Sequence, residues 1–191
     1  MIPGFAGVPL AVDCVGAGPL VLFVHGFPEL CSSWHRQMPA VAAAGYTAAA
    51  LDTRGNGESG QPPLASDYRM EAMTADLAAV AHALAPGQPV TLVGHDWGAA
   101  IVWHAALAYP HFFTRIAALS VPWTGLPERP AIDLFDERFT AKNRFFYQAY
   151  FQEEGVAEAE LEADVALFLR AFYHGISGEA QPGDWPNRKA A

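Results

Sequence analysis

The chain has 191 residues, of which 52% are hydrophobic and 16% are charged, and its formal net charge is −9 at pH 7. This composition supports a buried core and excludes an intrinsically disordered chain. The acidic balance, without a basic cluster, argues against nucleic acid or an anionic membrane as a partner. The length predicts one domain with room for part of a second.

Targeting, membrane and metal signals are not evident. The start of the chain, Met1 to Phe5, lacks the charged head and long apolar core of a signal peptide, and no apolar run is long enough to cross a bilayer. Cys14 and Cys31 have the spacing of neither a metal site nor a disulfide framework. We therefore expect a soluble, cytoplasmic protein that needs no cofactor and no metal.

Strand and helix signals alternate between residues 20 and 121. Leu20 to Val24 is a continuous apolar run, typical of a strand buried on both faces of a parallel sheet. The alternation predicts an α/β fold, a mostly parallel sheet with helices on both faces. The predicted strands are residues 20–24, 46–51, 90–93 and 116–121, and the predicted helices are residues 33–43, 73–84 and 99–109.

A sharp turn is predicted where the strand over residues 90–93 meets the following helix. Its sequence is Gly94-His95-Asp96-Trp97-Gly98. The Gly-x-x-x-Gly spacing is that of a nucleophile elbow, which lifts its central side chain above the sheet. Glycines allow the close backbone approach that such a turn requires. The central residue, usually Ser in this motif, is Asp96 here.

Aspartate at this position changes the expected chemistry. A carboxylate is a poor acyl nucleophile, because the resulting anhydride is high in energy, but it can displace a leaving group at saturated carbon. The product is an alkyl ester on the enzyme, which water cleaves at the carbonyl with help from an oxyanion hole. The N-terminus of the helix after Asp96 favours the charged carboxylate.

A second loop follows the strand that ends at Val24. It reads His25-Gly26-Phe27-Pro28 and falls at the same edge of the predicted sheet as Asp96, where ligands bind in such folds. Its position is that of the second oxyanion donor, so the backbone N–H groups of Phe27 and Trp97 would form the hole. A cis bond before Pro28 would direct the Phe27 N–H inward.

The character of the chain changes near residue 125. Three prolines interrupt the segment, and beyond them come an aromatic stretch over residues 144–151, an acidic stretch over 153–162 and a helical apolar stripe over 161–172. No strand is predicted after residue 121. We therefore predict two parts, a sheet-containing core over residues 1–124 and a helical lid over residues 125–191.

These motifs together resemble the soluble epoxide hydrolases of the α/β-hydrolase superfamily. The resemblance rests on residues 25–29, 52–59 and 94–98, and on residues 147–153 and 155–160, which are similar to that family's cap domain. It implies an α/β-hydrolase fold with a partial helical cap. The implied activity is hydrolysis of a small apolar epoxide to a diol. No cofactor is implied, and the oligomeric state stays open.

The resemblance also implies residue roles. Asp96 would be the nucleophile, Phe27 and Trp97 the oxyanion donors, and Tyr147 one of two cap tyrosines that protonate the epoxide oxygen. Substrate contacts would come from His25, Gly26, Pro28, Trp123 and Gln148. In this family the catalytic acid and histidine follow the cap. We therefore expect an incomplete C-terminal end of the fold, a fragment without the water-activating base, and no full turnover.

Two other functions remain open. A haloalkane dehalogenase also uses an Asp nucleophile and a neighbouring Trp, which Trp97 supplies, but the Phe27 side chain cannot donate a hydrogen bond to a halide. Tyr147 favours the epoxide hydrolase. The absent base would equally suit a non-catalytic binding module or one half of a two-chain assembly.

Overall fold

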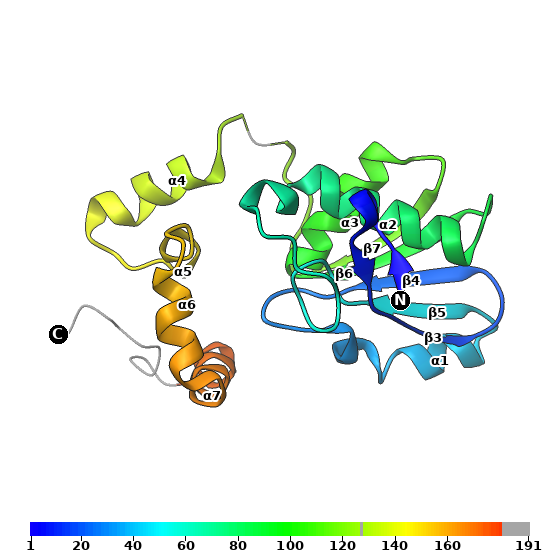
Figure 1. The fold of residues 1–191 in the computed structure, drawn as a ribbon, viewed down its shortest axis with the longest axis horizontal. Helices are drawn as coiled ribbons and strands as arrows, with labels where there is room; N and C mark the ends of the chain where they lie inside the picture. The colour runs from blue at the N-terminus through cyan, green and yellow to red at the C-terminus, as the bar shows by residue number, and fades with distance from the viewer. Residues whose placement is uncertain (127, 181–191) are drawn as a thin grey trace. The chain divides into compact units, whose positions relative to one another are not determined.

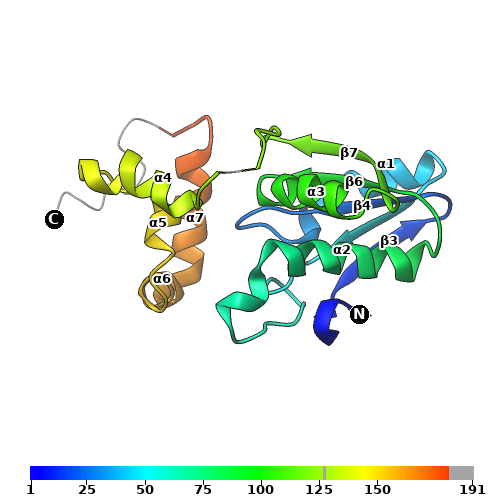
Figure 2. The same ribbon diagram turned by 90° about the horizontal axis from the view of Figure 1, so that it is seen from above.

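The computed structural model describes residues 1–126 and 128–180. The chain divides into two compact units, residues Met1–Thr124, called unit 1, and Gly125–Ala191, called unit 2 (Figures 1 and 2). Unit 1 contains the sheet, and the described part of unit 2 contains helices and no strand.

A five-stranded mixed sheet is the centre of unit 1, with the order β3-β5-β4-β6-β7 (Figure 1). Strands β5, β4, β6 and β7 run parallel and β3 pairs antiparallel with β5, so the mostly parallel sheet predicted from the sequence is confirmed. The strands are β3 (Val12–Gly16), β4 (Leu20–Val24), β5 (Thr47–Leu51), β6 (Val90–His95) and β7 (Phe113–Leu119), and a separate pair is formed by β1 (Ile2–Pro3) and β2 (Pro9–Leu10).

Helices cover both faces of this sheet. Figure 1 shows α2 (Met70–Leu84) and α3 (Trp97–Ala108) above the sheet and α1 (Met38–Ala43) below it. Alternate residues of β4 serve the two layers: Leu22 packs into the cluster with α2 and α3, whereas Phe23 packs into the cluster with α1. Both faces of β4 are buried, as its continuous apolar run predicts. The short 3-10 helices are η1 (Phe5–Gly7), η2 (Cys31–Trp34) and η3 (Ala65–Tyr68).

Two predicted elements differ in the structure. The helix predicted over residues 33–43 is broken into η2 and α1, and Pro39 lies in the first turn of α1. Proline has no N–H and its ring clashes with a preceding helical turn, so it begins a helix and does not continue one. The strand predicted to reach Val121 ends at Leu119, where Ser120 takes a left-handed conformation with φ 70°.

The register of the parallel strands brings three loops to one edge of the sheet. Val24 of β4 pairs with Leu51 of β5 on one side and with Gly94 of β6 on the other. The loops that follow these three strands therefore begin side by side. These loops are residues 25–28, called the Phe27 loop, the loop that begins at Asp52, and the elbow at Asp96.

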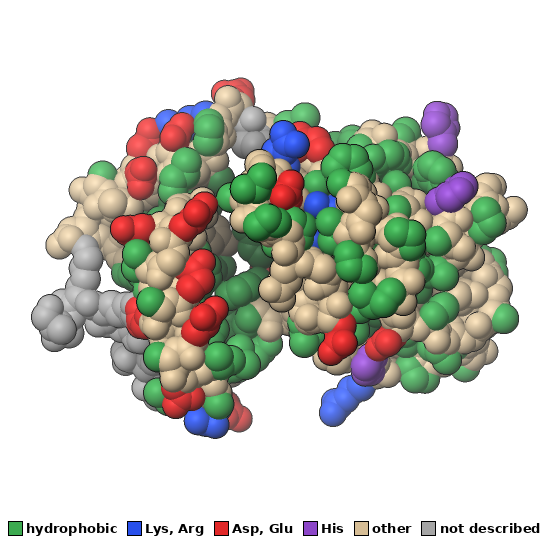
Figure 3. Space-filling view, viewed as in Figure 1, with side chains coloured by type: hydrophobic (Ala, Val, Ile, Leu, Met, Phe, Trp, Pro, Cys, Tyr) green, Lys and Arg blue, Asp and Glu red, His purple; other side chains and the backbone are tan. Residues whose placement is uncertain are grey.

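Unit 2 is helical over its described residues. Phe172 of α7 and Ala157 of α6 are its buried hydrophobic side chains. Acidic side chains gather on its surface along α6 and η5, where Figure 3 shows a column of red atoms. The elements are α4 (Ala131–Arg138), η4 (Thr140–Lys142), α5 (Tyr147–Tyr150), α6 (Val156–Leu161), η5 (Glu162–Asp164) and α7 (Val165–Ile176). No helix among the described residues of either unit combines the length and apolarity needed to span a bilayer.

Candidate active site

Asp96 stands alone between β6 and α3, at the tip of a one-residue turn. Its φ of 53° and ψ of −121° lie far from the conformations that residues other than glycine prefer. The chain holds this conformation because the Asp96 carbonyl accepts the Ala99 N–H at 3.0 Å, while the Asp96 N–H donates to Leu119 O at 3.2 Å. Strain of this kind is stored where the surrounding structure enforces it, commonly at active sites. The elbow predicted from the sequence is confirmed.

Three glycines make room for this turn. A Cβ atom on Gly94 would overlap the carbonyl oxygen of Gly98, and a Cβ on Gly98 would overlap that of Val24. A Cβ on Gly26 would come within 2.5 Å of the Asp96 Cβ. Any larger residue at these positions would displace the backbone that carries Asp96. The Gly94 and Gly98 spacing is thus a packing requirement of the elbow.

The Asp96 carboxylate is half-buried and meets the Phe27 loop directly. The backbone N–H of Phe27 donates to Asp96 Oδ1 at 3.0 Å, and the bond between Phe27 and Pro28 is cis, as predicted. Trp97 is the first residue of α3, so its N–H is among the four that find no partner within the helix. The positive end of the helix dipole faces the same carboxylate. An anionic oxygen at this position is therefore stabilised by the backbone.

The His25 side chain holds the Phe27 loop in position through hydrogen bonds. Its side chain is buried, Nδ1 donates to the Gly26 carbonyl at 2.8 Å, and Nε2 accepts the Thr53 N–H at 3.0 Å. With both ring nitrogens engaged, His25 links the loops after β4 and β5. Positioning the loop fits this geometry better than the direct substrate contact that the resemblance implies.

Glu29 was missed as a functional candidate by the sequence reasoning. Its Oε2 accepts the Gly26 N–H at 3.3 Å and lies 3.1 Å from His95 Nδ1. The carboxylate therefore ties the Phe27 loop to the elbow residue next to Asp96. An acidic residue two positions after Phe27 was the available signal, but only the fold shows that His95 lies within its reach.

The other expected site residues are placed as follows. Trp123 lies in unit 1 beyond β7, with its ring 5.9 Å from those of Trp103 and His104. Tyr147 and Gln148 begin α5 in unit 2, where the Gln148 amide donates to Tyr147 Oη at 3.0 Å.

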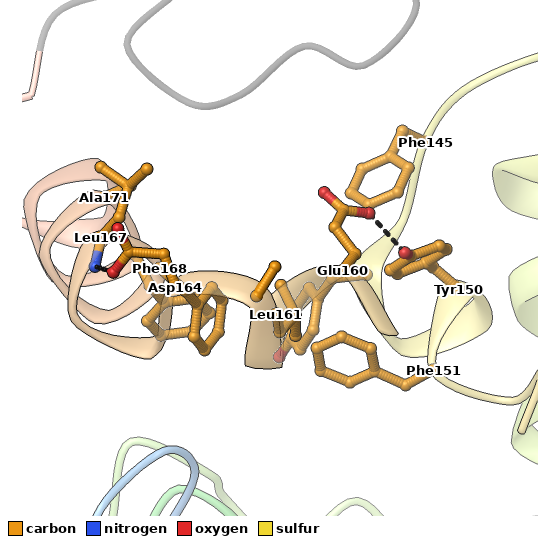
Figure 4. A pocket seen from close by; sticks show the side chains of 12 residues that line it. Phe145, Tyr150, Phe151, Glu160, Leu161, Asp164, Leu167, Phe168 and Ala171 are labelled. Atoms are coloured by element: carbon orange, nitrogen blue, oxygen red, sulfur yellow. Dashed lines mark hydrogen bonds between the residues drawn. The ribbon is translucent and has the colours of Figure 1, made fainter. Parts of the chain in front are cut away.

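Unit 2 contains a cavity of about 370 Å³, open to solvent and lined by residues of α5, α6 and α7. Figure 4 shows aromatic and aliphatic side chains around it, with hydrogen bonds from Tyr150 Oη to Glu160 Oε2 at 2.6 Å and from the Leu167 N–H to Asp164 Oδ1 at 2.9 Å. Tyr147 is among the lining residues. The cavity can hold a small apolar group.

Comparison with known proteins identifies the family. The family model described as the alpha/beta hydrolase fold matches residues 19–184. The chain belongs to the α/β-hydrolase fold family. The structure of an epoxide hydrolase from an endophytic Streptomyces superposes with a TM-score of 0.86 at 47% sequence identity, covering 91% of this chain and 51% of that one.

Curated relatives of this α/β-hydrolase are also named as epoxide hydrolases. Epoxide hydrolase A of Mycobacterium tuberculosis is 42% identical over 180 residues, which are 93% of this chain and 54% of that protein. Bifunctional epoxide hydrolase 2 of Sus scrofa is 41% identical over 167 residues, 87% of this chain and 29% of that protein. The chain thus spans about half the length of the first relative and less than a third of the second.

Proposed function

We propose that this α/β-hydrolase chain carries the nucleophile and oxyanion hole of an epoxide hydrolase. One observation carries the proposal: a carboxylate, Asp96, occupies the elbow and accepts the Phe27 backbone N–H at 3.0 Å. A carboxylate at this position suits attack on saturated carbon better than attack on an acyl group, whose product would be a high-energy anhydride. The epoxide hydrolase names of the relatives at 41% and 42% identity support the choice of substrate class.

The proposed reaction follows from the two carboxylate oxygens. Asp96 Oδ2 attacks an epoxide carbon, a C–O ester bond forms, and the C–O bond of the epoxide breaks to leave an alkoxide that takes up a proton. Oδ1, which accepts the Phe27 N–H, becomes the ester carbonyl oxygen. When water adds to that carbonyl, the Phe27 and Trp97 N–H groups stabilise the oxyanion formed on Oδ1. Collapse releases the diol and regenerates the carboxylate.

The substrate is proposed to be a small apolar epoxide, acted on in the cytoplasm, with residues 125–191 serving as the cap. The aromatic lining of the cavity in unit 2 supports an apolar substituent. Gly26 and Pro28 are proposed to shape the floor of the substrate site, with His25 holding their loop in position, and Trp123 and Gln148 to contribute contacts.

The test is the intact mass of the chain after incubation with styrene oxide. Among the described residues no histidine ring is hydrogen-bonded to Asp96, since His25 and His95 have other partners. We therefore expect one adduct per chain, located on the peptide that contains Asp96 and persisting for hours. Hydroxylamine removes an ester but not a thioether, so its action distinguishes Asp96 from alkylated Cys14 or Cys31.

Other outcomes separate the competing functions. An adduct on cysteine alone, or no adduct and no diol, would contradict epoxide opening and favour the binding module. Release of chloride from a chloroalkane, without reaction with the epoxide, would favour the dehalogenase. The residue that supports this alternative is Trp97, which lies next to the proposed nucleophile as in that class of enzyme.

Tyr147 is proposed to give its proton to the epoxide oxygen. A phenol can stabilise a developing alkoxide without being ionised at neutral pH. We expect Tyr147→Phe to slow ester formation by about 10²-fold or more, the usual size of a general-acid contribution. Tyr150→Phe is the matched control, because Tyr150 lies on the same helix and bonds to Glu160. Equal slowing in both variants would mean that the aromatic packing of α5, and not the Tyr147 proton, is responsible.

A further inference from the structure

Three metal-ligating side chains meet on the surface of unit 1. Asp13 lies on β3, Cys31 begins η2 and His35 directly follows it. His35 Nε2 lies 2.7 Å from Asp13 Oδ2, and Cys31 Sγ lies 3.7 Å from the same oxygen. The three ligand atoms all lie within 4.8 Å of one another.

The backbone holds these residues in place independently of their side chains. Asp13 is opposite Ala50 in the ladder between β3 and β5. The Cys31 N–H donates to Asp52 Oδ1 at 2.8 Å, and the His35 N–H donates to Ser32 O at 3.1 Å. Because strand pairing and a 3-10 turn fix the three Cα positions, only side-chain torsions need to change for all three to face one point.

We propose that Asp13, Cys31 and His35 form a binding site for a divalent transition-metal ion of borderline softness, with Zn²⁺ as its type ligand. Thiolate, imidazole and carboxylate are the ligands that Zn²⁺ takes in proteins, in tetrahedral sites with bonds of about 2.0–2.3 Å. Three protein ligands leave the fourth position to water. Sulfur and nitrogen donors select against Mg²⁺ and Ca²⁺, which prefer oxygen.

Binding requires two rearrangements. The hydrogen bond between His35 Nε2 and Asp13 opens, and the ring proton passes through solvent to Nδ1, so that Nε2 offers a lone pair to the metal beside the Asp13 carboxylate. The Cys31 S–H loses its proton to solvent as the metal–sulfur bond forms. Burial and the nearby carboxylates of Asp52 and Asp13 raise the pKa of the Cys31 thiol to about 12. A bound divalent cation has the opposite effect on the thiol, because its positive charge offsets the Asp13 carboxylate and favours the thiolate that coordinates it.

This site differs from the expectation drawn from the cysteine spacing. Cys14 and Cys31 are both free, and neither pairs with the other. In the sequence, β4 lies between the strand that contains Asp13 and the turn that contains Cys31. The two residues are brought together only by the fold. The cluster is also independent of the proposed epoxide chemistry, since binding can be measured without substrate.

Titration of the metal-free chain with Zn²⁺ by calorimetry tests the site. We expect one ion per chain, and at least about tenfold weaker binding in Cys31→Ser and in His35→Ala. With Co²⁺ as the probe, the wild-type chain should show a thiolate-to-cobalt charge-transfer band. A saturating concentration of Zn²⁺ should also raise the melting temperature, because the ion binds the folded state.

Cys14→Ser and His111→Ala are the matched controls, and His111 is an exposed histidine in the turn between α3 and β7. Cys14 is exposed and adjacent to Asp13 in β3, where alternation directs its side chain to the opposite face. Both controls should bind Zn²⁺ as the wild type does. Unchanged binding in Cys31→Ser would show that the Cys31 thiol is not a ligand, and equal weakening in Cys14→Ser would show adventitious binding to thiols in general. Either result would overturn the proposal. If Cys31→Ser fails to fold, absence of the charge-transfer band in the wild type would overturn it instead.

Discussion

Asp96→Ala will abolish formation of the styrene oxide ester, with a decrease of at least about 10³-fold in its rate. Alanine has no nucleophilic oxygen, and the Phe27 N–H that donates to Asp96 Oδ1 is left facing the vacated position. The measurement is the time course of the hydroxylamine-sensitive mass gain. The backbone strain at φ 53° arises from the Cβ atom, which alanine and aspartate share. We therefore expect the elbow to survive the substitution.

The control for this variant is Asp136→Ala, which removes an exposed carboxylate from α4. It should form the adduct at the rate of the wild type. An unchanged adduct in Asp96→Ala would assign the alkylation to another side chain and reject the proposed nucleophile. Circular dichroism of both variants shows whether a loss of reaction reflects a loss of fold.

Asp76→Ala will destabilise unit 1 by about 3–5 kcal/mol, the usual effect of removing one partner from a buried ion pair. The side chains of Asp76 and Arg54 are 3% and 1% exposed, and Arg54 Nε and Nη2 each donate to one Asp76 oxygen at 2.7 Å. Asp76 Oδ1 also accepts the Phe5 N–H at 2.8 Å. The substitution therefore leaves a buried guanidinium and a backbone N–H without their acceptor.

Urea denaturation followed by circular dichroism measures this effect as a shift of the unfolding midpoint. Glu71→Ala is the matched control, because Glu71 is an exposed acidic residue on the same helix, α2. Its expected change is within about 1 kcal/mol. Similar midpoints for the two variants would mean that the Arg54–Asp76 pair contributes no more than a surface charge.

Arg54 of this pair directly follows Thr53, whose N–H donates to His25 Nε2 at the start of the loop after β5. Arg54 Nη1 donates to Asp67 O at 2.6 Å and Nη2 donates to Phe5 O at 3.2 Å. The guanidinium thus joins that loop to the N-terminal segment and to α2. The Asp76 carboxylate beside it raises the pKa of Arg54, which further favours the charged guanidinium.

Local sequence patterns were sufficient for the four parallel strands and the elbow, but not for the antiparallel edge strand β3. The run from Leu20 to Val24 predicts a buried strand because only a strand with both faces covered can be apolar at every position. Gly94 and Gly98 predict the tight turn at Asp96 because a Cβ at either position would overlap a carbonyl oxygen. Both signals are read within a few residues, where steric limits act directly.

Contacts between distant segments could not be predicted in this way. The hydrogen bonds of His25 to Thr53, the Arg54–Asp76 pair and the cluster of Asp13, Cys31 and His35 each join segments that lie on different elements. Which charged or polar side chains pair depends on strand order and register, and no local pattern encodes these. The sequence by itself therefore determined the parallel strands, the elbow and its carboxylate. The tertiary structure decided which groups support that carboxylate, because their spacing exists only after the sheet has formed.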